Sequence, residues 1–486
     1  MTLRLNATEG DGPGGPELPK GSRRELPAGW VWATIAELCD VNPRYFDEEP
    51  DDNDLISQVP MAAVEAETGR MDASVSVRYG DYKAKSLTRF QENDVLFAKI
   101  TPCMENGKIT KAQGLTGGQA LGSTEFHVLR SRGAVLPEYL MHYLLQRSVR
   151  DAAEYHMSGA VGQRRVPRSY LESLEIPVPP LNEQHRIVID VNQQNARIEA
   201  GEGALHEAQS RTNDLIQAIR TQALWPATGN PLPEDWSWGV VGDVLDGIEA
   251  GKSFTCLPRP AKSDEWGIIK VSAMTWGAFR PDENKAVPPE RETDPNHEIC
   301  TGDILVSRAN TVDYVGAPVL VGPTRGKLLL SDKSLRLIPK PTVDPNWLIH
   351  VLSSPPVRAQ YSGAATGTSD SMRNISQKVV RSARIPIPHS NTVRKLIAQE
   401  IEDRIQLVEG FRTPIAQHSE RARTLRAALL RAAFTGNLVA QDPDDEPASV
   451  VVNRIRAGQT VAKKSPRKRA TRKPRPAPPG QEELPS

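Results

Sequence analysis

The segment Pro-Glu-Tyr-Leu-Met-His at Pro137–His142 returns later in the chain as Pro-Asn-Trp-Leu-Ile-His at Pro345–His350, an offset of 208 residues. Four more pairs keep the same order at offsets of 206 to 209: Gly29–Trp32 with Asp235–Trp238, Asn93–Leu96 with Gly302–Leu305, Ile176–Pro179 with Ile385–Pro388, and Ala227–Asn230 with Phe434–Asn437. Solenoid repeats are about 20–50 residues long, whereas this period is long enough for a whole domain and its connector. The repeat therefore predicts two copies of one domain.

In the first copy, the segments before the repeated Ile-Pro motif are short and β-rich. Asp94–Ile100 and Thr124–Leu129 are predicted strands, Pro137–Tyr155 has helical spacing with proline in its first turn, and Leu174–Val178 is a last strand. After Leu181 the pattern changes, because no proline occurs from Asn182 to Leu224. Apolar residues there recur every seven positions, which is typical of coiled-coil packing. The two matching series are Val191, Ile198, Leu205, Thr212, Ile219 and Ile401, Val408, Ile415, Ala422, Leu429.

Breaks are expected in both long helices. Gly201 and Gly203 interrupt the first series, and Gly410 and Pro414 interrupt the second. A proline inside a helix costs about 3 kcal/mol and kinks the axis. Two ordinary amphipathic helices packed on the domains are the alternative interpretation.

The composition is that of a globular protein, with 38% hydrophobic and 25% charged residues in 486. No apolar run is long enough for a membrane helix, and Met1–Pro19 lacks a signal-peptide core, so we expect a cytoplasmic protein. The formal net charge is zero, but Lys463–Ser486 holds eight Lys or Arg and two Glu. The rest of the chain is therefore acidic overall, so any binding of nucleic acid must come from local basic patches or from a partner.

The motifs of stand-alone enzymes are incomplete. Gly247–Ser253 has one residue too few between its glycines for a phosphate-binding loop. Asn42-Pro-Arg-Tyr differs from the Asn-Pro-Pro-Tyr of amino-methyltransferases, and Pro281–Lys285 is too compressed for a nuclease metal site. The four cysteines are isolated, and the histidines lack metal-binding spacing. The chain is predicted to be non-catalytic, with no metal and no cofactor of its own; a stand-alone DNA methyltransferase or endonuclease is the alternative.

Two signatures resemble the specificity subunit of type I restriction–modification systems. They are Pro-Leu-Asn-Glu-Gln within Ile176–Val188 and Ala-Phe-Thr-Gly-Asn-Leu within Leu429–Leu438. The second copy departs from the first signature, since Pro388–Arg394 lacks the Glu-Gln pair. The resemblance implies an α+β fold: two repeated β-rich target-recognition domains joined by two long antiparallel, coiled-coil-like helices with pseudo-twofold symmetry.

The expected segments follow from this resemblance. They are a disordered N-terminus at 1–22, target-recognition domain 1 at 23–180, spacer helix 1 at 181–226, target-recognition domain 2 at 227–388, spacer helix 2 at 389–440 and a disordered basic tail at 441–486.

The resemblance also implies the function and the partners. Each domain would read one half of a split target in double-stranded DNA. Two methyltransferase subunits would bind S-adenosylmethionine and methylate adenine at N6, and restriction subunits would use ATP and Mg to translocate and cut the DNA.

Base-reading residues are predicted in polar turns that follow strands or lie in flexible basic loops. Arg and Lys suit guanine, while Asn and Gln suit adenine; solvated turns with some phosphate contact are the alternative. The predicted DNA-binding residues of the first copy are Lys99, Thr101, Asn106, Lys108, Gln163, Arg164 and Arg165, and those of the second are Arg308, Asn310, Thr368, Ser369 and Arg373.

Overall fold

The computed structural model describes residues 25–160, 162–227, 229–253, 255–275, 277–369 and 372–464. These residues form two compact units, which divide between Gly201 and Glu202 and again between Glu420 and Arg421. Each unit therefore combines one β-rich module with parts of both long helices. This division cuts through the predicted spacer helices instead of following their ends.

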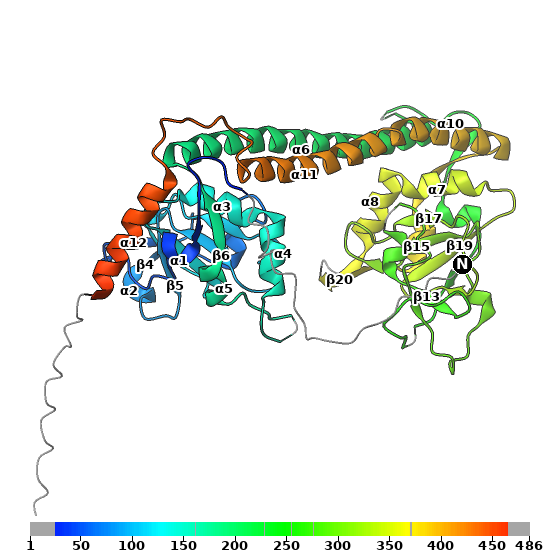
Figure 1. Cartoon of the computed structure of the whole chain (residues 1–486). Coiled ribbons are helices and arrows are strands. Elements are labelled where there is room, and N and C mark those ends of the chain that lie inside the picture. Colours follow the sequence, from blue (N-terminus) through cyan, green and yellow to red (C-terminus); the bar gives the residue numbers. More distant parts are fainter. Residues whose placement is uncertain are drawn as a thin grey trace, which may run out of the picture. The chain divides into compact units, whose positions relative to one another are not determined.

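Unit 1 contains the first module, in blue and cyan in Figure 1. Its elements are β1 (Val31–Thr34), α1 (Ile35–Leu38), β2 (Cys39–Val41), β3 (Leu55–Val59), β4 (Ser76–Arg78), α2 (Tyr79–Tyr82), β5 (Thr88–Gln91), β6 (Val95–Ala98), β7 (Ile109–Lys111), β8 (Gln119–Gly122), β9 (Phe126–Ser131), α3 (Pro137–Leu145), α4 (Arg147–Tyr155), α5 (Arg168–Ser173) and β10 (Glu175–Val178). Two four-stranded sheets have the orders β2-β9-β6-β7 and β4-β3-β8-β5, and β1 pairs with β10. The predicted strands and the helical region are confirmed, although the helical region is divided at Gln146.

Unit 2 repeats this plan with the second module. Its elements are β11 (Trp236–Val240), β12 (Leu245–Ala250), β13 (Gly267–Ile269), β14 (Asn284–Ala286), β15 (Ile304–Ser307), β16 (Ala309–Asn310), β17 (Pro318–Leu320), β18 (Leu328–Leu329), β19 (Ser334–Pro339), α7 (Pro345–Ser353), α8 (Pro355–Ala364), β20 (Thr366–Ser369), β21 (Met372–Asn374), α9 (Gln377–Ser382) and β22 (Arg384–Pro388). The order β12-β19-β15-β17 corresponds to the first sheet of unit 1, and β11 pairs with β22 as β1 does with β10. The α+β class and the two sheet-rich domains are thus confirmed.

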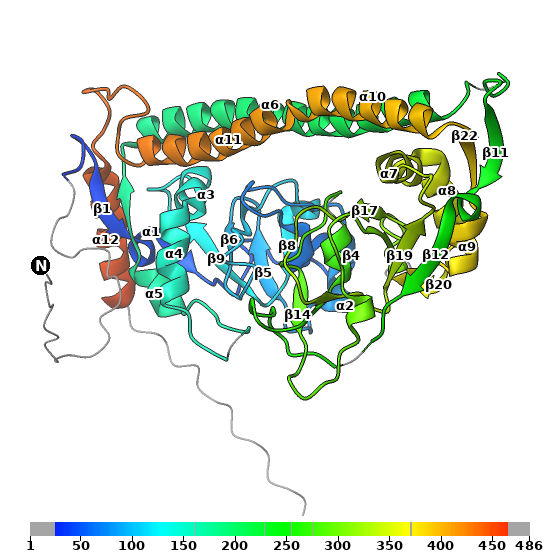
Figure 2. The ribbon, with the colours of Figure 1, turned by 90° about the vertical axis from the view of Figure 1, so that its right-hand side faces the viewer.

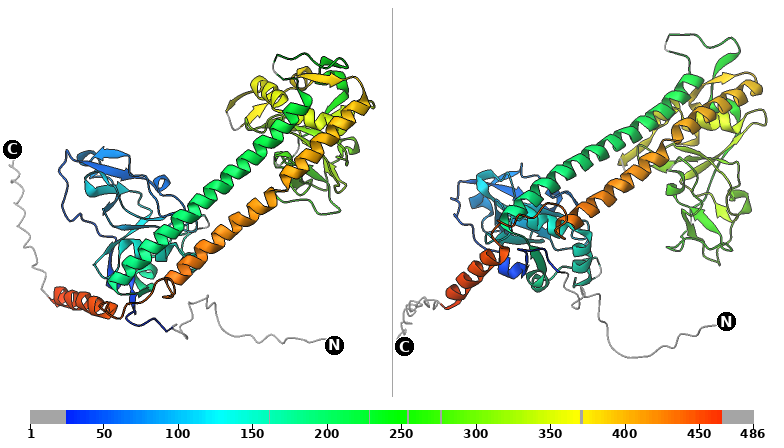
Figure 3. Two further views of the ribbon diagram at one scale, coloured as in Figure 1. Left: turned by 90° about the horizontal axis from the view of Figure 1, so that it is seen from above. Right: turned by 45° about the horizontal axis from the view of Figure 1, so that its top comes forward.

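The long helices are α6 (Leu181–Leu224), α10 (Asn391–Glu409) and α11 (Arg412–Ala433). In unit 1, Val191 and Ile198 of α6 share a core with Leu429 and Ala433 of α11. Figure 3 shows α6 beside α11 and α10. The seven-residue seam is therefore a buried contact, as predicted.

In unit 2, the other end of α6 packs with the beginning of the second helical segment. Ile216 and Ile219 share a core with Ile401 and Val408 of α10. The start of α6 thus packs with the end of α11, and the end of α6 packs with α10. This pairing makes the helices antiparallel and gives each module the same helical support.

The predicted break in the first helix is wrong. The helix α6 runs unbroken through Gly201 and Gly203, and a Cβ at either glycine would meet open space. The second segment does break, because residues 410 and 411 separate α10 from α11. Pro414 lies in the first turn of α11, where its missing N–H costs no helical hydrogen bond.

The prediction of disorder from residue 441 is also wrong for part of the tail. Helix α12 (Ala448–Lys464) packs on unit 1 through Ala448 and Val452, and Figure 2 shows it beside β1 and α1. Arg456 Nε donates to Glu37 at 3.0 Å, and the backbone N–H of Ala448 donates to Gly29 at 2.9 Å. The predicted disordered residues 1–22 and the rest of the tail, residues 465–486, lie outside the described residues.

Candidate nucleic-acid interface

The structure brings two predicted loops of the first module together. The backbone N–H of Thr101 donates to Arg164 O at 3.0 Å, and Ile100 forms an antiparallel bridge with Arg165. The turn after β6 therefore lies beside the loop before α5. Four of the seven residues predicted for this module therefore occupy one surface: Lys99, Thr101, Arg164 and Arg165.

The second module has the same pairing. Strand β16 pairs antiparallel with β21, with Ala309 opposite Asn374 and Asn310 opposite Arg373. Ala309 and Asn374 each lie 209 residues after Ile100 and Arg165, so the two pairs correspond in the repeat. Thr368 and Ser369 belong to the adjoining strand β20, but their side chains lie outside the described residues.

Several predicted side chains already have partners within the first module. Arg165 makes two hydrogen bonds to the Glu125 carboxylate, at 3.0 and 2.9 Å, and the pKa of Glu125 is lowered chiefly by this contact. Arg164 Nη2 donates to Glu105 and Glu154 at 3.3 and 3.1 Å. To contact DNA, the guanidinium groups of Arg164 and Arg165 would have to break these ion pairs.

The other predicted residues differ in solvent exposure and in their hydrogen bonds. Lys108 Nζ donates to Met61 O at 3.0 Å, which makes it part of the module's own structure. Asn106 and Gln163 are exposed. In the second module Arg308 is exposed, whereas the Asn310 amide donates to Ser307 Oγ at 3.2 Å and accepts from Thr311 N at 2.9 Å.

An arginine supports the turn in each module, buried in the first and half-buried in the second, and sequence analysis missed both. Arg150 on α4 donates through Nη1 to Glu105 O at 2.6 Å, and Arg358 on α8 donates through Nη2 to Asp313 O at 3.0 Å. Gly107 and Gly316 lie against these arginines at positive φ, and a Cβ at either would come within about 3 Å of the guanidinium. The sequence did contain a signal for them, because the arginine and the glycine of the first module both recur in the second at the offset of the repeat.

The rejected enzyme motifs have structural roles. The amide nitrogen of Asn42 contacts His127 Nδ1 at 3.1 Å, and its oxygen accepts from the backbone N–H of Val128 at 2.9 Å, so both ends of the amide have partners inside the module. Gly247 lies within strand β12, not in a phosphate-binding loop. Among the described residues, no group of three or more His, Cys, Asp or Glu could hold a metal ion. Over the same residues, no helix is long and apolar enough to cross a membrane.

The first family signature fixes the start of α6, and Arg394 does the same for α10. In unit 1, Gln184 Nε2 donates to Ala134 O and Pro179 O, both at 2.9 Å. In unit 2, Arg394 at the equivalent position donates to Thr342 O at 2.8 Å and Pro388 O at 2.9 Å. Arg394 therefore replaces the missing glutamine at the corresponding carbonyls.

The other half of the Glu-Gln pair and the second signature act in unit 1. The Trp30 indole N–H donates to the buried Glu183 carboxylate at 3.0 Å. Phe434 packs edge-on against Tyr139 and Tyr143 of α3, with ring centroids 5.0 and 5.1 Å apart. Both signatures thus attach helix ends to the first module.

Comparison with known proteins agrees with this architecture. The model of the type I restriction modification DNA specificity domain matches residues 27–203. The Type I restriction enzyme EcoEI specificity subunit of Escherichia coli is 28% identical, with 84% of this chain and 83% of that protein covered. The chain thus contains a type I restriction–modification DNA specificity domain and is similar to type I specificity subunits over most of its length. The predicted resemblance is therefore confirmed.

Two further matches agree with this similarity. The EcoAI specificity subunit of Escherichia coli is 36% identical, but only over 35% of this chain and 28% of that protein. A solved chain from a study of the assembly and conformational transition of the type I R-M system has a TM-score of 0.63 and 22% identity, covering 85% of this chain and 100% of that chain. That likeness supports the fold.

Proposed function

We propose that this specificity subunit reads a bipartite DNA target, with one half-site for each module. The observation that carries the proposal is the repeated pairing of two loops, at Thr101 with Arg164 and at Asn310 with Arg373, in modules of one topology. The same backbone frame presents different side chains in the two copies, which is what two different half-sites require.

The chain itself is proposed to do no chemistry. Methyl transfer from S-adenosylmethionine to N6 of adenine would belong to two methyltransferase subunits, and translocation and cleavage with ATP and Mg to restriction subunits. Asn42, the candidate for holding a flipped base in the Asn-Pro-Arg-Tyr motif, has its amide engaged within the module. The alternative of a stand-alone methyltransferase or endonuclease has no support from the family match.

Reconstitution tests this proposal. The purified chain, its partner adenine methyltransferase subunit and the mixture of both are incubated with random-sequence duplexes and labelled S-adenosylmethionine, and N6-methyladenine is mapped by sequencing. We expect methylation only with the mixture, at a split sequence with an unread gap. Methyl transfer by the chain alone, or methylation by the mixture without sequence preference, would contradict it.

A further inference from the structure

One surface hollow of unit 2 is lined by two half-buried arginines, Arg220 and Arg358. The hollow has a volume of about 400 Å³, which is the size of a small-molecule site. It lies between the end of α6, the loop after the 3-10 helix η4 (Val271–Met274), the turn after β16 and the start of α8. We call it the arginine hollow, and all of its described lining belongs to unit 2.

Each of the two guanidinium groups has a donor that the described residues leave unused. Arg358 Nη2 donates to Asp313 O at 3.0 Å, but its buried Nη1 has no partner among the described residues. Arg220 Nη1 is 3.1 Å from the oxygen of Gln217, in the amide orientation that also lets Gln217 donate to Ser353 O. The buried Nε of Arg220 has no partner within the described chain. A buried donor without an acceptor is unfavourable, so an added acceptor would stabilise this region.

In unit 1 the corresponding arginine is neutralised by the protein itself. Arg150 lies 208 residues before Arg358, and its Nη2 donates to Glu67 Oε1 at 2.6 Å. Glu67 belongs to the loop between Ala63 and Asp72, which a backbone hydrogen bond of 2.8 Å closes. This loop therefore supplies the anion for the arginine of the first module.

The corresponding loop of unit 2 contains no carboxylate. It lies between Ala273 and Arg280, which a backbone hydrogen bond of 3.0 Å joins, and it begins four residues after β13, as the loop of unit 1 begins four residues after β3. The loop has six residues (274–279) against eight (64–71) in unit 1, and none of the six is Asp or Glu. Gly277 lines the hollow, and a Cβ there would meet no described atom within 4 Å beyond its chain neighbours. The second module has thus kept the arginine but not its counter-ion.

The arginine hollow therefore holds positive charge with little compensation. Burial lowers the pKa of Arg220 and of Arg358, because it removes water from their charged forms. Glu402 and Glu409 attract Arg220 electrostatically but form no ion pair with it in the described structure. Asp313, the acidic residue of the described lining, is exposed and makes no ion pair with either arginine. Buried charges are stabilised by a group of opposite charge, so the hollow favours an anion.

We propose that the arginine hollow binds a small oxyanion, a phosphate or a carboxylate group, between Arg220 and Arg358. Guanidinium groups donate in pairs to the oxygens of both anions, which makes arginine a frequent partner of such groups. The oxyanion takes the place that the Glu67 carboxylate has in unit 1, and it joins the end of α6 to the start of α8. This site goes beyond the proposed function and does not depend on it.

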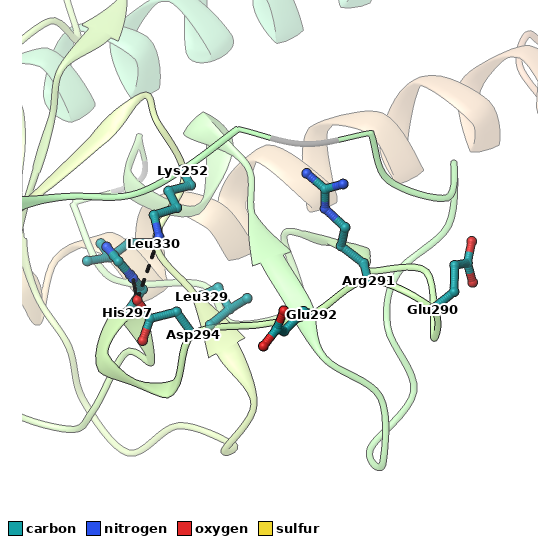
Figure 4. Close-up of a pocket in the computed structure, with 8 residues that line it drawn as sticks. All are labelled: Lys252, Glu290, Arg291, Glu292, Asp294, His297, Leu329 and Leu330. Carbon is teal, nitrogen blue, oxygen red and sulfur yellow. Dashed lines mark ion pairs between the residues drawn. The ribbon is translucent and has the colours of Figure 1, made fainter.

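Another hollow of unit 2 provides a matched control. Figure 4 shows Lys252 and Arg291 there with the carboxylates of Glu290, Glu292 and Asp294. Lys252 Nζ lies 3.7 Å from Asp294 Oδ2. Because three carboxylates repel an anion, we expect this second hollow to bind no phosphate.

Thermal unfolding of the full chain tests the proposal. The unfolding temperature is measured at constant pH and ionic strength while sodium phosphate replaces sodium chloride. Phosphate also stabilises proteins by exclusion from their surface, so the decisive signal is a rise that saturates. At about ten times its dissociation constant, phosphate should raise the unfolding temperature by about 3–6 °C. Arg220→Gln and Arg358→Gln should each abolish this saturable rise.

The control variants are Lys252→Gln in the second hollow and Arg150→Gln in unit 1. Both should keep the saturable rise, because Lys252 and Arg150 already lie beside carboxylates of the protein. Broadening of the phosphorus NMR signal of inorganic phosphate measures binding in the folded proteins, and it should occur with the wild type and not with Arg220→Gln. A wild-type response that does not saturate, or an equal response in wild type, Arg220→Gln and Arg358→Gln, would overturn the proposal.

The complex with the methyltransferase partner distinguishes the two sources of the oxyanion. If the saturable rise persists in the complex, the hollow binds a free oxyanion. If the rise is lost there and Arg358→Gln weakens assembly, a carboxylate of the partner occupies the hollow; both results support the site. If phosphate has no saturable effect but Arg220→Gln and Arg358→Gln lower the salt dependence of duplex binding, the arginines contact DNA and the proposal is wrong. Specific methylation by the wild-type complex tests the proposed function separately.

Discussion

Arg394 shows how one residue can take over a structural task from a different residue type. It is buried, and its guanidinium reaches the carbonyls of Thr342 and Pro388, as Gln184 reaches Ala134 and Pro179 in unit 1. Sequence comparison of the two copies shows only that the Glu-Gln pair is missing. The shared task depends on carbonyls 52 and 6 residues away, which no local pattern reveals.

Replacing Arg394 tests this equivalence. Arg394→Ala should lower the free energy of unfolding by about 1–3 kcal/mol, because the carbonyls of buried Pro388 and of Thr342 lose their donor. Arg394→Gln should cost less, since glutamine satisfies the corresponding carbonyls in unit 1. Urea unfolding of both variants measures the difference, and equal losses for Ala and Gln would show that Arg394 is not a substitute for Gln184.

His350 on α7 should make the stability of unit 2 depend on pH. Burial, and then the positive charge of Arg220, lower its pKa to about 4. In the unfolded chain this imidazole takes up a proton near pH 6.5, whereas in the native protein it does so only near pH 4. Its contribution to the free energy of unfolding is therefore complete above pH 6.5 and is lost as the pH falls toward 4. The loss from this residue between pH 7.5 and 5 should be about 2 kcal/mol.

The comparison variant is His350→Gln, which has no titrating group. Its free energy of unfolding should fall less between pH 7.5 and 5 than that of the wild type. His142, at the equivalent position of unit 1, also has a pKa lowered by burial and contributes equally in both proteins. If both proteins show the same pH dependence, His350 takes up its proton as readily in the native protein as in the unfolded chain, and the expected contribution is wrong.

The predicted base-reading residues show the limit of sequence analysis at this scale. Residue type and loop position selected Lys99, Thr101, Arg164 and Arg165 as candidates, and the structure brings the two loops together. Their contact with DNA stays a prediction. The sequence pattern could not show that Arg165 is paired with Glu125, 40 residues away, or that Lys108 is held by a backbone carbonyl. Residues distant in sequence determine which side-chain donors are already hydrogen-bonded within the protein. The pattern of polar turns contains no information about these contacts.

At the scale of elements, the seven-residue pattern predicted the long helices, and Gly410 marked the break between α10 and α11, but the break expected in α6 is absent. Gly201 and Gly203 each disfavour helix by about 1 kcal/mol, which the buried seam on both sides offsets. The tail shows the opposite case. Its basic charge masked a helical spacing of apolar residues, Ala448, Val452 and Ile455, that packs α12 on unit 1.

The unbroken α6 leads to a prediction about spacing. Inserting four residues between Asn195 and Ala196 adds about 6 Å of helix, against roughly 3.4 Å per base pair. The unread gap should grow by one or two base pairs while both half-sites stay the same. Mapping of methylated sites measures this, with the same insertion between Asn230 and Pro231, in the connector, as a control that should leave the gap unchanged.

A changed half-site at constant gap would contradict the role of α6 as a spacer. Because four residues also shift the seam by half a heptad, a circular dichroism measurement should first establish that the variant retains its helices.

At the scale of the whole molecule, the repeat predicted the architecture because both copies must build the same frame. Trp30 and Trp236 begin it, and the Ile-Pro motifs at 176 and 385 close it by pairing β10 with β1 and β22 with β11. What differs between the copies is the exposed chemistry. At the paired loops, Ile100 and Arg165 of the first copy are replaced by Ala309 and Asn374 in the second. Surface chemistry therefore varies where packing imposes no constraint.

Separate cores make the modules independent in recognition. The apolar clusters of the first module involve only residues of unit 1, and those of the second only residues of unit 2. Replacing the exposed Asn106 and Gln163 by Ala should therefore change the first half-site alone, and Arg308→Ala the second alone. A lost bidentate base contact costs about 1–3 kcal/mol of discrimination. Sequencing of methylated sites from cells carrying each variant gives the two half-sites separately. If one variant relaxed both half-sites equally, its residues would act through folding or phosphate binding, because a base contact can report only on the half-site that its own module meets.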